Sequence, residues 1–143
     1  KLTKGRPMAD LVITPANVDG KIAGTLLKAY VLAEAVDAGE VCHLDSNNQA
    51  ALAQCDGTAQ EGVARILAVE SGLSGASTLF AIPSSVIDIG ATLTVGDAFY
   101  LSANPGKIMP PADLLTGNKI TLVGIAVAQN RLQVLLQNTG FTK

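Results

Sequence analysis

Short apolar runs separated by polar turns make up most of the chain. The runs are rich in Val, Ile, Leu and Ala, and Gly, Pro, Asn, Asp or Ser stands at their ends, which is typical of short β-strands joined by tight turns. Gly124 lies inside one run and indicates a bulge or bend. The pattern predicts strands at residues 25–33, 40–44, 49–53, 62–69, 78–82, 98–101, 107–109, 120–128 and 131–137.

The segment 21–35 allows two interpretations. As a helix it would gather several apolar side chains on one side, but Gly24 and the β-branched Thr25 weaken a helix. We favour a strand at 25–33, because two sets of side chains alternate along it as they do in an extended chain.

The chain contains nearly the same phrase twice. The first copy is VDAGEVCHLDSNNQAAL at 36–52, and the second is LTVGDAFYLSANPGKIM at 93–109. In each copy a Gly and an acidic residue lead into a four-residue run that ends in Leu, and a polar turn follows. These Gly-acid turns lie 57 residues apart, whereas the later Gly62 and Gly124 lie 62 apart, which indicates a five-residue insertion in the second copy. The insertion falls in PPADLLTGN, where residues 112–117 are expected to form one helical turn.

The repeat predicts an all-β fold with two quasi-repeated halves, at 36–82 and 93–137. A chain of 143 residues is long enough for one domain with a genuine core, which we place at 21–143. Because closure removes unpaired strand edges, two such copies of short strands predict a small barrel-like domain. Residues 1–20 are punctuated by Gly and Pro and are expected to form an extended N-terminal arm, ordered in part on a partner.

The overall composition argues against several classes of partner. Hydrophobic residues make up 48% of the chain and aromatic residues only 3%, which predicts a folded core of small aliphatic side chains. The net charge is −2 and the basic residues are scattered, so the footprint of a nucleic-acid-binding protein is missing. The apolar runs are too short for a membrane span or a signal peptide. We therefore expect neither nucleic acid nor a membrane as a partner.

The residues that could carry chemistry do not form a recognisable constellation. His43 is the only histidine and lies on the opposite face of its predicted strand from Cys42, so the two cannot act together as base and nucleophile. We expect His43 at the surface or the rim. The two cysteines, Cys42 and Cys55, lack a Cys-x-x-Cys spacing, and we expect buried thiols in preference to a disulfide.

The acidic residues give no better indication of a site. They fall on separate turns, whereas a hard cation needs several converging oxygens, so we interpret them as solvated turn residues. The Gly-acid turns lead into strands rather than helices and therefore do not predict a phosphate-binding loop. These acidic residues are Asp37, Glu40, Asp45 and Asp56. The sequence predicts no catalytic residue, no metal and no cofactor.

Three stretches resemble the small cement, or decoration, proteins of tailed bacteriophage heads. They are ADLVITPANV near the start, DAGEVCHLD in the first half, and residues 89–140, of which VGDAFYLSANPGKIMPPADL at 95–114 is the strongest portion. The resemblance covers nearly the whole chain after residue 9. It implies a compact barrel-like or β-tulip-like domain with an N-terminal arm and no enzymatic activity. The chain departs from the family pattern in the pair Cys42-His43 and in the charged residues 1–7.

The resemblance also implies a function, a location and partners. A protein of this kind is made in the host cytoplasm, binds the outer surface of the capsid and stabilises it by bridging neighbouring major capsid subunits. Its expected partners are the major capsid protein and further copies of itself, as a trimer in preference to a dimer. The arm is expected to add a strand to a capsid sheet, with Leu11 and Ile13 facing one way and Val12 the other. The predicted contact residues are Leu11, Val12, Ile13, Thr14 and Pro15.

Three other functions compete with this one. A tail component or the base of a head fibre should show stalk repeats or a receptor-binding tip, and the sequence has neither. A small Cys-dependent hydrolase needs a base beside its thiol, which the pattern does not supply. A soluble host adaptor that uses the same fold would not associate with phage heads.

Overall fold

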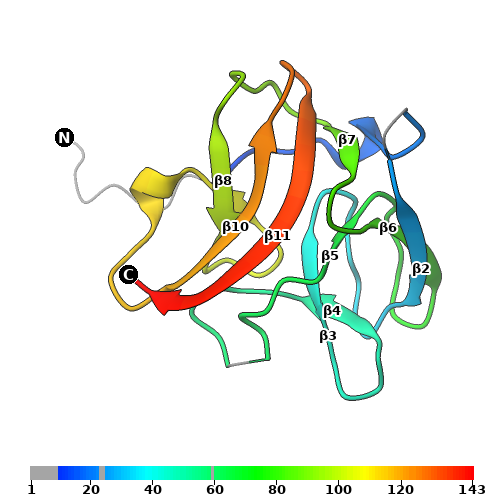
Figure 1. The fold of residues 1–143 in the computed structure, drawn as a ribbon. Helices are drawn as coiled ribbons and strands as arrows, with labels where there is room; N and C mark the ends of the chain where they lie inside the picture. Colours follow the sequence, from blue (N-terminus) through cyan, green and yellow to red (C-terminus); the bar gives the residue numbers. More distant parts are fainter. Residues whose placement is uncertain (1–9, 23–24, 59) are drawn as a thin grey trace.

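The computed structural model describes residues 10–22, 25–58 and 60–143, and the first nine residues of the predicted arm lie outside these ranges. The fold is all-β, as predicted, and its strands form two antiparallel sheets (Figure 1). The six-stranded sheet has the order β1-β7-β11-β10-β8-β9, and the five-stranded sheet has the order β2-β6-β5-β3-β4.

The strands are short, with the exception of the last two. In the five-stranded sheet they are β2 (Leu27–Val31), β3 (Val41–Leu44), β4 (Ala50–Leu52), β5 (Ile66–Ala68) and β6 (Ser77–Ala81). In the six-stranded sheet they are β1 (Val18–Asp19), β7 (Val86–Ile89), β8 (Ala98–Leu101), β9 (Ile108–Met109), β10 (Lys119–Ala126) and β11 (Arg131–Thr142). Two 3-10 helices, η1 (Pro15–Asn17) and η2 (Pro111–Asp113), complete the described elements.

The two halves of the chain follow the same path. Strands β2 to β6 pair in the order β2-β6-β5-β3-β4, and strands β7 to β11 pair in the corresponding order β7-β11-β10-β8-β9. The turn before the second strand of each half, β3 or β8, is also held by an equivalent hydrogen bond. The Gly39 N–H donates to the Ala68 carbonyl at 2.7 Å, and the Gly96 N–H donates to the Ala126 carbonyl at 2.8 Å. Both glycines have positive φ, at 95° and 93°.

These hydrogen bonds revise the predicted alignment of the repeat. Ala68 and Ala126 are equivalent and lie 58 residues apart, whereas Gly39 and Gly96 lie 57 apart, so this stretch is only one residue longer in the second half. The predicted five-residue insertion in PPADLLTGN is wrong, because Ala50 and Ile108, which precede it, are also 58 residues apart. Gly62 and Gly124, which the sequence alignment paired, are not equivalent. Gly62 lies in a turn before β5, whereas Gly124 lies inside β10 at the bulge that was expected there.

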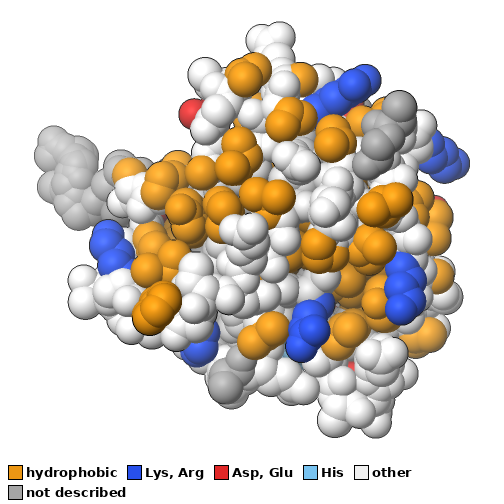
Figure 2. All heavy atoms as spheres, in the orientation of Figure 1, with side chains coloured by type: hydrophobic (Ala, Val, Ile, Leu, Met, Phe, Trp, Pro, Cys, Tyr) orange, Lys and Arg blue, Asp and Glu red, His pale blue; other side chains and the backbone are white. Residues whose placement is uncertain are grey.

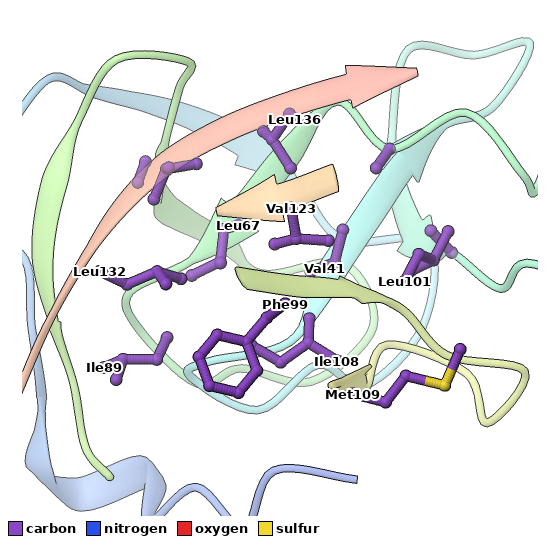
Figure 3. Packing of buried hydrophobic residues seen from close by; sticks show 14 of the residues in the cluster. Val41, Leu67, Ile89, Phe99, Leu101, Ile108, Met109, Val123, Leu132 and Leu136 are labelled. Atoms are coloured by element: carbon purple, nitrogen blue, oxygen red, sulfur yellow. The ribbon is translucent and has the colours of Figure 1, made fainter. Parts of the chain in front are cut away.

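The main core lies between the two sheets. Figure 3 shows Val41 and Leu67, from the five-stranded sheet, pointing toward the same space as Phe99 and Val123 from the six-stranded sheet. The other face of the five-stranded sheet carries a second buried cluster, which includes Phe80. The first half therefore buries both faces of its sheet, and the second half buries one.

The predicted barrel-like domain is not a closed barrel, because the strands form two open sheets. Each half keeps its five strands in its own sheet, and stacking the sheets face to face buries the apolar surface without joining their edges. An isolated bridge between Leu32, after β2, and Ala50, in β4, brings the two edges of the five-stranded sheet together at one point.

Several predicted strand boundaries also change. The expected strand at 62–69 is reduced to β5, because residues 60–63 form a turn and only the last part of the run pairs with β3 and β6. Strands β1 and β7 were not predicted, and β11 extends five residues beyond the predicted end. The expected helical turn at 112–117 is the 3-10 helix η2, which begins at Pro111.

Candidate binding surface

The described part of the predicted arm crosses the six-stranded sheet from one edge to the other. At one edge the Leu11 N–H donates to the Ile108 carbonyl in β9 at 2.8 Å. At the other edge the Thr14 N–H donates to the Gly90 carbonyl at 2.9 Å, and β1 pairs with β7. In the first half, the Ala33 N–H donates to the Ala50 carbonyl at the place that corresponds to Ile108. In the second half, a residue of the arm therefore makes the hydrogen bond that in the first half is made by a residue just after β2.

The side chains of the arm alternate as expected, but they do so against the chain's own core. Leu11 and Ile13 are partly buried against the main cluster, whereas Val12 is 85% exposed. Thr14 and Pro15 are exposed as well. Contact of these five residues with a capsid protein stays a prediction, and Val12 and Pro15 are the exposed apolar side chains among them.

His43 is buried, so the expectation that it lies at the surface or the rim is wrong. Its side chain is 6% exposed, and its Nδ1 atom has no hydrogen-bond partner. His43 does lie on the opposite face from Cys42, as expected, but that face is turned toward the six-stranded sheet instead of solvent. Burial of both residues on different faces keeps them from forming a nucleophile and base pair.

Both cysteines are free and buried. Burial raises the pKa of the Cys42 thiol far above its ordinary value. Burial also raises the pKa of Cys55 to about 11, with a further contribution from the charge of Asp56. Since the thiolate is the reactive form of cysteine, both side chains act here as small apolar groups.

The acidic residues of the turns differ in their burial. Asp37 and Asp56 are exposed, as predicted. Glu40 is buried, not solvated as expected, and its Oε1 atom accepts the Asp37 N–H at 2.8 Å. Its Oε2 atom forms an ion pair with Lys107 Nζ at 2.9 Å, which links the first half to the second. Asp45 accepts backbone N–H groups within the β3–β4 turn. The part of the chain that the structure describes has no cluster of three or more His, Cys, Asp or Glu side chains that could hold a metal ion.

The outward face of the six-stranded sheet is partly exposed and carries apolar side chains together with Gln133 and Gln137. Its apolar side chains are partly exposed and belong to neither buried cluster, and the paired residues of neighbouring strands lie side by side on it. Figure 2 shows hydrophobic side chains gathered over β8, β10 and β11. We call this surface the outer face. Its apolar residues are Ala98, Tyr100, Leu122, Ile125 and Leu135.

The repeat shows why the outer face differs from its counterpart. Val41 pairs with Leu67 in the first half, and Ala98 pairs with Ile125 at the equivalent place in the second half. Val41 and Leu67 are fully buried, because the second half covers them. Ala98 and Ile125 are only partly buried. Sequence alternation identified the strands concerned, but it could not distinguish the covered face from the open one.

Membrane spans and known relatives give no further assignment. No helix among the described residues is long and apolar enough to cross a membrane. Comparison with models of known protein families found no match, and comparison with curated proteins found none either.

Proposed function

We propose that this protein is a structural component of a tailed-bacteriophage head, which binds the outside of the capsid and stabilises it by bridging neighbouring major capsid subunits. The observation that carries the proposal is the partly exposed outer face, whose paired apolar residues correspond to fully buried ones in the first half. Partly exposed apolar side chains that lie side by side on a sheet are suited to a protein interaction site. The resemblance of residues 95–114 to cement proteins supplies the identity of the partner.

The physical basis of stabilisation is preferential binding to the assembled shell. A protein that binds across the joint between two subunits binds the shell more tightly than the separated subunits, and this shifts the equilibrium toward the shell. Each contact needs only modest affinity if several are made at once, because linked contacts raise the overall affinity by about two to four orders of magnitude.

In this proposal the protein acts as a homo-oligomer on the outer surface of the virion, after synthesis in the host cytoplasm. A trimer is preferred to a dimer, because a trimer matches the threefold and quasi-threefold positions of an icosahedral shell. The net charge of −2 suits a position outside the shell, away from the packaged nucleic acid. The burial of both thiols and of His43 supports a non-enzymatic role.

Binding to purified heads tests the proposal. The protein is mixed with expanded heads from the phage that encodes it, and the heads are sedimented and then heated. We expect the wild-type chain to sediment with the heads and to raise the temperature at which they release DNA. The variant Ile125→Glu places a charge in the middle of the outer face and should lose binding, because an unpaired carboxylate is costly to desolvate.

The matched control is Leu73→Glu, since Leu73 is 75% exposed in a loop of the first half, away from the outer face. This variant should bind as the wild type does. Wild-type protein that stays in the supernatant, or antibody labelling confined to phage tails, would contradict a role on the head. Circular dichroism of both variants separates loss of binding from loss of folding.

A further inference from the structure

A second surface feature lies beside the five-stranded sheet, and its lining shares no residue with the outer face. There a groove of about 400 Å³ runs between the first half and the end of β11. Its lining combines apolar side chains with two basic ones and contains no acidic side chain. We call it the basic groove. The residues used below are Lys28, Tyr30, Leu44, Arg65, Ile82 and Leu136.

The two basic side chains of the groove have no acidic partner. Lys28 and Arg65 are both exposed, and among the described residues the ion pair between Lys107 and Glu40 is the only one. Lys28 Nζ instead lies 5.3 Å from the centre of the Tyr30 ring, in a cation–π arrangement. Two cations that face one groove without a counter-charge create a positive potential there.

The floor of the groove is apolar. Tyr30, Leu44 and Ile82 are partly buried and pack against the second core cluster, and the Tyr30 ring meets Phe80 edge-on at 5.9 Å. Leu136, from the second half, closes the groove on the other side and is buried. Because these side chains are held by the core, the groove is preformed, which lowers the entropic cost of binding a ligand there.

The surroundings of the groove carry the same sign of charge. Figure 2 shows Lys and Arg side chains spread over this face of the molecule, with hydrophobic side chains between them and few Asp or Glu side chains. The whole chain has a net charge of −2, so its acidic residues are concentrated elsewhere. Such segregation of charge favours approach of an acidic surface to this face in preference to the others.

We propose that the basic groove binds an extended acidic segment of a partner polypeptide. One carboxylate of the segment would lie between Lys28 and Arg65, and a neighbouring apolar side chain would pack on Tyr30 and Ile82. Nucleic acid is the less suitable occupant, because the groove offers two cations and one aromatic ring instead of a basic track with several stacking platforms. The inference rests on the proposed function only in identifying the partner as the major capsid protein.

A peptide titration tests the groove by itself. The probe is a fluorescein-labelled octapeptide of alternating Glu and Leu, and the comparison probe replaces every Glu by Gln. We expect the Glu peptide to bind more tightly than the Gln peptide and to weaken as salt is added. The double variant Lys28→Met/Arg65→Gln removes both charges and keeps most of each side chain, and its affinity for the Glu peptide should fall roughly fivefold or more.

The control variant replaces one Lys and one Arg outside the groove and therefore removes the same number of positive charges. Lys21→Met/Arg131→Gln should bind the Glu peptide within about twofold of the wild type, because at most screened long-range attraction is removed. Equal binding of the two peptides, or an equal loss in both double variants, would overturn the proposal. So would tighter binding of a single-stranded oligothymidylate through Lys28 and Arg65.

Sedimentation with phage heads separates this inference from the proposed function. If wild-type protein binds heads and Lys28→Met/Arg65→Gln binds them less tightly, both stand. If the double variant binds heads as the wild type does, the groove is not used on the capsid and the inference fails, although the proposed function stands. If the wild type does not bind heads, the proposed function fails, and the peptide titration still decides whether the groove binds acidic segments.

Discussion

At the residue scale, the two buried thiols show how a side chain with reactive chemistry becomes a packing group. Cys42 packs in the cluster around Phe80, and Cys55 packs in the main core between the sheets. Desolvation disfavours the thiolate at both positions, so the pKa of each thiol is raised. The chain gains apolar volume from these residues and no nucleophile.

We predict that neither thiol reacts with iodoacetamide in the folded protein at about pH 8, while both react once the chain is unfolded in guanidinium chloride. Mass spectrometry of the alkylated chain gives the measurement. The Cys55→Ala variant shows which of the two sites carries any residual label. Rapid labelling of Cys55 in the folded state would mean that this thiol is exposed.

The raised pKa of Cys55 also predicts a pH dependence of stability. As the pH rises from the ordinary thiol value of 9.0 toward about 11, the unfolded chain releases this proton while the folded chain keeps it. The unfolded state then binds fewer protons, so the free energy of unfolding should fall with rising pH in this window. Urea titrations at about pH 8 and pH 10 measure the fall. The Cys55→Ala variant should show a smaller one.

At the scale of elements, the repeated Gly-acid turn offers an internal comparison. Gly39 and Gly96 have nearly the same positive φ, but their surroundings differ. A Cβ atom on Gly39 would lie 2.7 Å from Ile13 Cγ2, whereas a Cβ atom on Gly96 would meet nothing within 4 Å. The difference shows that Ile13, in the arm, packs against the turn at Gly39.

We predict that Gly96→Ala lowers the free energy of unfolding by about 1–2 kcal/mol, the cost of placing a Cβ at this positive φ. Gly39→Ala should cost roughly 1 kcal/mol more, because Ile13 must move as well. Urea denaturation of the two variants gives the comparison. In the Ile13→Ala background the extra cost should vanish, and equal losses without that change would mean that Ile13 does not pack on this turn.

The strands themselves were largely predictable from local pattern. The β3–β4 hairpin was expected around residues 46–48, and Asn48 adopts the positive φ that such a turn needs. The short strand β7 was missed although its Val and Ile residues favour a strand, because Pro83 and two serines stand directly before it. The side of β3 on which His43 lies was also predictable, but its burial depends on the second half of the chain, which no local pattern contains.

At the scale of the whole molecule, the repeat could be seen in the sequence and the stacking of the halves could not. The phrase around Gly39 returns around Gly96, which predicts two similar sheets. Whether two such sheets close into one barrel or stack depends on which faces meet. The sequence could not identify the outer face for the same reason. Ala98 and Val41 occupy equivalent positions in their strands, and the strand pattern does not show which of the two is covered by the other half.

The ion pair between Glu40 and Lys107 joins the two halves. Its two residues should contribute unequally to the free energy of unfolding. Lys107→Met leaves the carboxylate of the buried Glu40 without its counter-charge but with its hydrogen bond from Asp37, and we predict a loss of about 1–2 kcal/mol because Lys107 itself is half exposed. Glu40→Ala removes both the ion pair and the hydrogen bond from a buried site, and we predict a loss of roughly 2–3 kcal/mol. Thermal denaturation at low and high salt tests the order, and a larger loss from Lys107→Met would contradict it.

The clearest test of the stacked arrangement compares two equivalent residues, Leu67 and Ile125. Leu67 is fully buried between the sheets, whereas Ile125 is partly exposed on the outer face. Leu67→Ala should therefore lower the free energy of unfolding by about 2–5 kcal/mol, and Ile125→Ala by about 1 kcal/mol or less. Urea denaturation measures both values. A cost of Ile125→Ala as large as that of Leu67→Ala would mean that the outer face is covered in solution. If that cost also grew with protein concentration, the cover would be a second copy of the chain, because association stabilises by mass action.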